Sequence, residues 1–120
     1  MSDAFVGSLT DVLRQFWGQF DSAWFVDFEF RQDANHHSVP VSMHAVEKLT
    51  GTEILLWGDE LSTLRRAPFA TGPRDLMVAY SSPAELSCFL KLGWPFPSNV
   101  LDIYVETIAS INGRLDIWQG

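Results

Sequence analysis

The sequence predicts a single domain of the α/β class. Residues 24–30 alternate large apolar side chains with two carboxylates, which is the period of a β-strand that buries one face. A second alternating segment and a short third strand pattern follow closely, so the first three strands should form an antiparallel meander. Two later runs of continuous apolar residues, separated by a helical pattern, are typical of buried parallel strands joined by a helix. A chain of 120 residues is long enough for one such domain with a real core.

The N-terminal segment, residues 5–20, places apolar side chains at helical spacing, and many of them are aromatic. We therefore expect an amphipathic helix before the first strand. Its apolar face would pack on the sheet. Alternatively, it would serve as a contact surface for a partner chain or for a second copy of this chain.

The first strand carries Asp27 and Glu29 two positions apart. This spacing places both carboxylates on one face, roughly 7 Å apart, and Val26, Phe28 and Phe30 on the other. The two carboxylates repel each other, and their partial burial on so apolar a strand would cost solvation energy. This cost is small if both face water, and a bound cation would compensate it. Carboxylate oxygens are hard ligands that suit Mg²⁺ or Mn²⁺.

The middle of the chain predicts two strands, at residues 40–46 and 53–57, with turns before and between them. The turn before them contains His36 and His37, which we interpret as a solvated loop because no third metal ligand lies at a familiar spacing. Residues 58–73 are irregular and contain the only basic pair of the chain, Arg65 and Arg66. These arginines are the best candidates to contact a phosphate backbone, although a solvated loop explains them equally well.

The next run, residues 76–80, predicts a fully buried parallel strand. A Ser-Ser-Pro sequence is suited to begin the helix that follows, and Gly93 to end it. Glu85 then lies in the first helical turn, beside the carboxyl end of a buried strand, which is the edge of an α/β sheet where ligands bind. Residues 100–104 predict the last strand, and residues 105–111 a final helix.

Composition narrows the range of functions. A hydrophobic content of 47% is that of a folded protein, and a net charge of −7 argues against a broad basic surface for nucleic acid. It does not exclude a nuclease in which a metal-loaded acidic pocket contacts phosphate locally. The only cysteine, Cys88, excludes an internal disulfide and should be a buried thiol. Without a signal-peptide pattern or a long apolar run, the sequence predicts a cytoplasmic protein with no membrane contact.

Taken together, these features resemble the DEDD superfamily of 3′-5′ exonucleases, whose domains have a ribonuclease H-like fold. Residues 26–29, Val-Asp-Phe-Glu, look like the first motif of that family, Asp-X-Glu on the first strand. Residues 78–86 are similar to the second motif, in which a strand ends in a turn and an acidic residue follows in a helix. Residues 90–102 resemble the downstream part of the proofreading domain of family-A DNA polymerases.

The resemblance implies a function and a set of site residues. Asp27 and Glu29 would be ligands of two catalytic ions, Mg²⁺ or Mn²⁺, and Glu85 would stand at the position of the second-motif aspartate. Asp102 corresponds to a residue that is more often structural than a metal ligand. Ser81 stands where the family often has an asparagine that contacts substrate. The substrate would be the 3′ end of single-stranded DNA, or RNA, and the reaction two-metal hydrolysis of a phosphodiester.

The third motif of the family would lie several dozen residues beyond Asp102, whereas this chain ends at Gly120. The resemblance therefore implies an exonuclease domain truncated before that motif. Two alternatives stay open: a catalytically incomplete fold that acts as an accessory or interaction module, and a fragment completed by another polypeptide or a second copy. Asp116 in the tail could substitute for the missing carboxylate. A terminal base would stack on Tyr80 or Trp94, unless both belong to the core.

Overall fold

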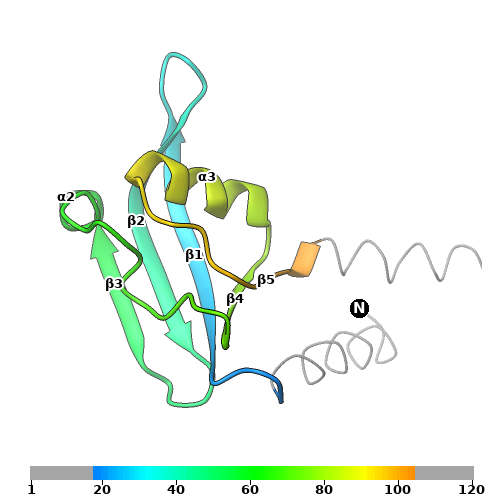
Figure 1. Cartoon of the computed structure of the whole chain (residues 1–120). Helices are drawn as coiled ribbons and strands as arrows, with labels where there is room; N and C mark the ends of the chain where they lie inside the picture. The colour runs from blue at the N-terminus through cyan, green and yellow to red at the C-terminus, as the bar shows by residue number, and fades with distance from the viewer. Residues whose placement is uncertain (1–17, 105–120) are drawn as a thin grey trace, which may run out of the picture.

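A computed structural model describes residues 18–104 of the chain, and its central feature is a five-stranded mixed sheet (Figure 1). The elements in chain order are β1 (Ser22–Gln32), β2 (Ser38–Glu47), β3 (Glu53–Trp57), α2 (Gly58–Leu61), β4 (Asp75–Ala79), α3 (Ser82–Leu92) and β5 (Val100–Asp102). The strand order is β3-β2-β1-β4-β5. The first three strands are antiparallel, and β4 and β5 run parallel to β1. The predicted α/β class is confirmed, with an antiparallel meander followed by a β-α-β unit.

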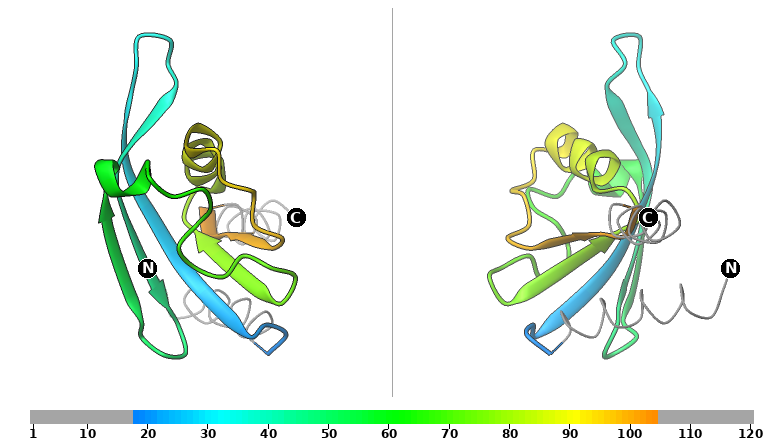
Figure 2. Two further views of the ribbon diagram at one scale, coloured as in Figure 1. Left: turned by 60° about the vertical axis from the view of Figure 1, so that its left-hand side comes forward. Right: turned by 90° about the vertical axis from the view of Figure 1, so that its right-hand side faces the viewer.

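The β1–β2 hairpin is long and projects beyond the other strands (Figure 2). Its tip is organised by Asp33, whose Oδ1 accepts hydrogen bonds from the backbone N–H groups of Asn35 and His37. His36 has a φ of 61°, in the left-handed region that is more usual for glycine or asparagine. The pairing register shifts between Glu29 and Phe30. Phe30 lies in this projecting part and is exposed, whereas Val26 and Phe28 are buried.

The face of the sheet under α3 holds the larger core cluster, which contains Trp24, Val26 and Phe28 of β1. Phe89 of α3 is completely buried there and makes edge-on ring contacts with Phe28 and Trp94. The Trp94 indole N–H donates a hydrogen bond to the Leu64 carbonyl. This bond connects the loop between α3 and β5 with the loop between α2 and β4. Trp94 is therefore part of the core, one of the two interpretations that the sequence left open.

A second, smaller cluster lies on the opposite face and is built from Ala23, Leu76, Val78 and Leu101. The expected strand at residues 76–80 is confirmed as β4, buried and parallel to β1. Tyr80 lies just past the end of β4 and is 65% exposed, so its assignment to the core is wrong. Its ring contacts Tyr104 edge-on instead.

Two expected helices, at residues 5–20 and 105–111, lie wholly or almost wholly outside the described residues, as does Asp116. The one-turn helix α2 was not expected within the irregular segment 58–73. Cys88 is buried in α3, as predicted, and burial raises the pKa of its thiol to about 12. Across residues 18–104, none of the helices has the length and apolarity needed to cross a membrane.

Candidate functional site

Asp27 and Glu29 lie side by side on β1, on the face opposite α3. Both carboxylates are exposed, while Val26 and Phe28 between and beside them are buried on the other face. The predicted alternation of faces is therefore confirmed over this part of the strand. Within residues 18–104, neither carboxylate takes part in a salt bridge or a hydrogen bond. Nothing in this part of the chain compensates their charge.

The position of these carboxylates along β1 coincides with the point where β1 and β4 separate. The parallel pairing of the two strands ends at Phe25 and Val78. Beyond it, the backbone of β1 is open toward the start of α3, and the Glu85 side chain reaches into this opening. Its Oε2 accepts a hydrogen bond of 3.0 Å from the backbone N–H of Phe28. Glu85 is thus attached to the residue that lies between Asp27 and Glu29.

Glu85 is only 5% exposed, although a carboxylate normally lies at the surface. Burial is the main reason why the pKa of this carboxyl is raised to about 7. The Phe28 N–H lowers the pKa, and the negative charges of Asp27 and Glu29 add to the rise. The three acids are therefore close enough to interact electrostatically. They differ in environment, since two are exposed on one face and the third is buried beside the same strand.

Asp102 has a different role from these three acids. Its Oδ2 accepts hydrogen bonds from the backbone N–H and from the hydroxyl of Ser82, at 2.8 and 2.7 Å. Asp102 therefore caps the N-terminus of α3 from the end of β5. The residue at the cap position itself, Ser81, makes no side-chain capping bond, and its carbonyl accepts the N–H groups of Ala84 and Glu85. The structural role implied for Asp102 agrees with this geometry.

The arginine pair is not brought to the carboxylates. Arg65 and Arg66 lie in the loop between α2 and β4, and both are exposed. Arg66 lines a hollow of about 560 Å³ together with Trp24, whose side chain lies on the face opposite Asp27. A nucleic-acid strand bound at Asp27 and Glu29 would therefore contact these arginines only if it passed around the edge of the β-sheet.

A hollow of about 510 Å³ lies beside Asp27, on the face opposite α3. It is lined by Phe25, Val26, Asp27, His44, Val46, Val78, Tyr80 and Ile103. His44 was not predicted as a site residue, and its ring nitrogen is hydrogen-bonded to Glu53. The antiparallel register pairs His44 directly with Asp27, so the pairing of the two strands is the signal that could have identified it.

The donor atoms at this site suit a hard divalent cation, because two unpaired carboxylates face the same side and a third acid lies beside them. In the present arrangement, residues 18–104 contain no group of three or more histidine, cysteine, aspartate or glutamate side chains placed to hold one ion. Asp27 and Glu29 are the residues of this region that could bind a cation directly. Glu85 is held by the Phe28 amide.

Comparisons with family models, with curated proteins and with solved structures give no match for this chain.

Proposed function

We propose that this protein is a metal-dependent phosphodiesterase of the 3′-5′ exonuclease type, built on a ribonuclease H-like fold. The observation that carries the proposal is the contact of Glu85 with β1. Its carboxyl accepts a hydrogen bond from the backbone N–H of Phe28, the residue between Asp27 and Glu29. Acids from two segments far apart in the sequence thus lie beside the same stretch of β1. Such an arrangement costs stability and is typical of functional sites.

The arrangement of the sheet supports the same proposal. β1, which carries two of the acids, is the central strand, and the helix that carries the third follows the neighbouring parallel strand. This is the order that the resemblance to the exonuclease family implies. The hollow beside Asp27 adds an apolar floor and the aromatic ring of Tyr80, which suit the base of a terminal nucleotide.

In this proposal Asp27 and Glu29 bind the cation directly. Glu85, once ionised, adds a third negative charge near the cation. A bound Mg²⁺ or Mn²⁺ would supply a water of lowered pKa and stabilise the charge of the leaving oxygen. The Phe28 amide fixes the orientation of the Glu85 carboxyl. Because the pKa of Glu85 is about 7, this acid is fully ionised only in mildly alkaline solution, and activity should rise with pH through this range.

The test is hydrolysis of a 5′-labelled single-stranded oligonucleotide in Mn²⁺. We expect stepwise shortening from the 3′ end by the wild type and at least a roughly hundredfold loss with Asp27→Asn, because a metal ligand is removed. Asp59→Asn, which changes an exposed acid of α2, is the matched control and should keep full activity. Cleavage that is equal in wild type and Asp27→Asn would disprove the assignment.

A second candidate is a non-catalytic accessory module with an exonuclease-like fold. It is favoured by the fact that Glu85 and Asp102 each accept hydrogen bonds from backbone N–H groups, which explains both acids without a metal. The same assay separates the two candidates. A folded wild type that cleaves no oligonucleotide in Mn²⁺, and whose melting temperature does not respond to Mn²⁺, would favour the accessory module.

A further inference from the structure

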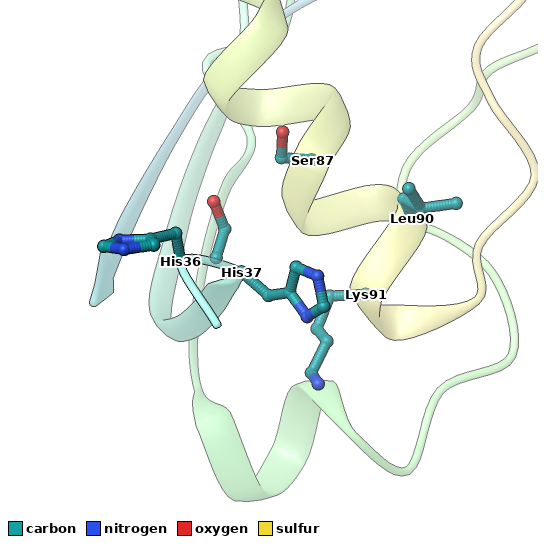
Figure 3. Close-up of a pocket in the computed structure, with 6 residues that line it drawn as sticks. His36, His37, Ser87, Leu90 and Lys91 are labelled. Atoms are coloured by element: carbon teal, nitrogen blue, oxygen red, sulfur yellow. The ribbon is translucent and has the colours of Figure 1, made fainter. Parts of the chain in front are cut away.

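A third hollow, of about 390 Å³, lies between the tip of the β1–β2 hairpin and the C-terminal half of α3 (Figure 3). It is lined by His36, His37, Ser38, Ser87, Leu90 and Lys91. Its volume falls within the range of small-ligand pockets, roughly 300–1,000 Å³. It lies on the α3 side of the sheet, whereas Asp27 and Glu29 project from the other side. It is therefore separate from the candidate catalytic site.

Two side chains that can carry positive charge converge on this hollow from different elements. His37 comes from the hairpin tip and Lys91 from the last turn of α3, and in Figure 3 the His37 ring points toward Lys91. The His36 ring points away from α3. Lys91 forms no salt bridge within the described part of the chain. A positive charge near the C-terminus of a helix is stabilised by the helix dipole. This explains the position of Lys91 in α3 but not the hollow beside it.

Of the two side chains, His37 has a carboxylate nearby, whereas Lys91 forms no salt bridge with the described residues. Asp33 is the nearest carboxylate, with its Oδ2 3.8 Å from the His37 Nδ1. Its other oxygen is already used by two backbone N–H groups of the hairpin. The pKa of Asp33 is lowered chiefly by the His37 N–H, with smaller effects from the charges of His37 and Lys91. On the far side of Lys91, an adjoining hollow is lined by two residues of opposite charge, Arg31 and Asp59.

The remaining lining is suited to a ligand that is anionic at one end and apolar at the other. The Ser38 hydroxyl has no hydrogen-bond partner among residues 18–104 and can donate to an anion. The Ser87 hydroxyl already donates to the Pro83 carbonyl, at 2.8 Å, and offers only its lone pairs. Leu90, which is 72% exposed, supplies an apolar wall.

We propose that this hollow binds an organic phosphate, with the phosphate group between Lys91, His37 and Ser38 and the organic part against Leu90. Charge-assisted hydrogen bonds to phosphate are the strong interactions that such a set of donors provides. The chain as a whole carries a net charge of −7 and repels anions, so specific binding at this place requires a local cluster of this kind.

The three histidines of the chain allow a direct test by NMR of their ring protons. The protein is titrated with thymidine 5′-monophosphate, inorganic phosphate or thymidine, in EDTA so that no cation occupies the carboxylate site. We expect the His37 resonances to move with both phosphates, and at lower concentration with the nucleotide. The His44 resonances report the other face of the sheet and should stay in place.

Variants decide whether the hollow is the binding site. Lys91→Met should weaken nucleotide binding by about tenfold or more, since a charged hydrogen-bond donor is lost. Lys48→Met, in the turn that follows β2 at the end remote from the hairpin tip, is the matched control and should bind as the wild type. Both positions are exposed, and unchanged circular dichroism verifies folding. Equal binding by Lys91→Met and wild type, a His37 response to thymidine, or equal affinity for phosphate and nucleotide would overturn the proposal.

Discussion

Glu85 shows how one buried side chain links stability to the proposed function. Its carboxyl is held by the Phe28 amide, but burial and the nearby charges of Asp27 and Glu29 oppose its ionisation. A buried acid with two acidic neighbours is unfavourable for folding at neutral pH. In the proposed function, the ionised form of Glu85 offsets this cost by contributing negative charge near the cation.

The first prediction concerns Glu85→Gln, which keeps a side-chain oxygen for the Phe28 N–H and removes the charge. The folded-state pKa of Glu85, about 7, lies above its ordinary value of 4.5, so the folded state holds the proton more tightly than the unfolded state. The stability of the wild type should therefore fall as pH rises from about 4.5 to about 7, relative to the variant. Above pH 7 the variant should be more stable by about 1–3 kcal/mol.

Urea denaturation of both proteins at pH 5 and pH 8 measures this difference. The gap between the two unfolding free energies should be larger at pH 8. Added Mn²⁺ should narrow it by stabilising the wild type more than the variant, which keeps Asp27 and Glu29 but lacks the charge of Glu85. A gap that does not change with pH would show that the ionisation of Glu85 does not contribute to stability.

At the scale of elements, the start of α3 depends on β5. The Ser-Ser-Pro sequence predicts the beginning of the helix correctly, but the capping oxygen comes from Asp102, twenty residues further along the chain. The end of α3 is local, because Gly93 adopts a left-handed φ of 74° and its N–H bonds to the Leu90 carbonyl.

The second prediction is that Asp102→Ala destabilises the domain by about 1–2 kcal/mol, because the Ser82 N–H loses its partner. The loss should be the same with and without Mn²⁺, since Asp102 acts as a cap and not as a cation ligand. Thermal denaturation in EDTA and in Mn²⁺ provides the measurement. A larger loss in Mn²⁺ than in EDTA would assign Asp102 to the metal site.

At the scale of the whole molecule, one aromatic cluster connects the sheet, α3 and the loops. Phe89 contacts the rings of Phe28, Phe69 and Trp94, which come from β1 and from two separate loops. Because protein interiors are densely packed, a cavity at this position cannot be filled by one neighbour without disturbing the others. The cluster also supports the part of β1 that carries the candidate site.

The third prediction compares two neighbouring residues of α3. Phe89→Ala should cost about 3–5 kcal/mol of unfolding free energy, whereas Leu90→Ala, at an exposed position, should change it by less than about 0.5 kcal/mol. Chemical denaturation checks both variants. Similar losses for the two would show that the face of α3 that packs on the sheet has been misassigned.

The sequence was sufficient to predict most of the elements. Strand β3 was predicted with its observed bounds, since a turn precedes it and its last four residues form a short apolar run. Helix α2 was missed because four residues are too few to show a helical period. Tyr80 was wrongly placed in the core because it continues the apolar run of β4, although the chain leaves the strand at Ala79.

What the sequence by itself determined was the class of the fold, the shared face of Asp27 and Glu29, and the presence of an acid at the start of α3. These follow from local periodicity, which the backbone imposes on neighbouring residues. The contact of Glu85 with Phe28, the pairing of His44 with Asp27, the capping by Asp102 and the hollow between the hairpin tip and α3 were decided only by the tertiary structure. Each of them joins residues from different elements, and only strand register and packing determine which of these residues meet.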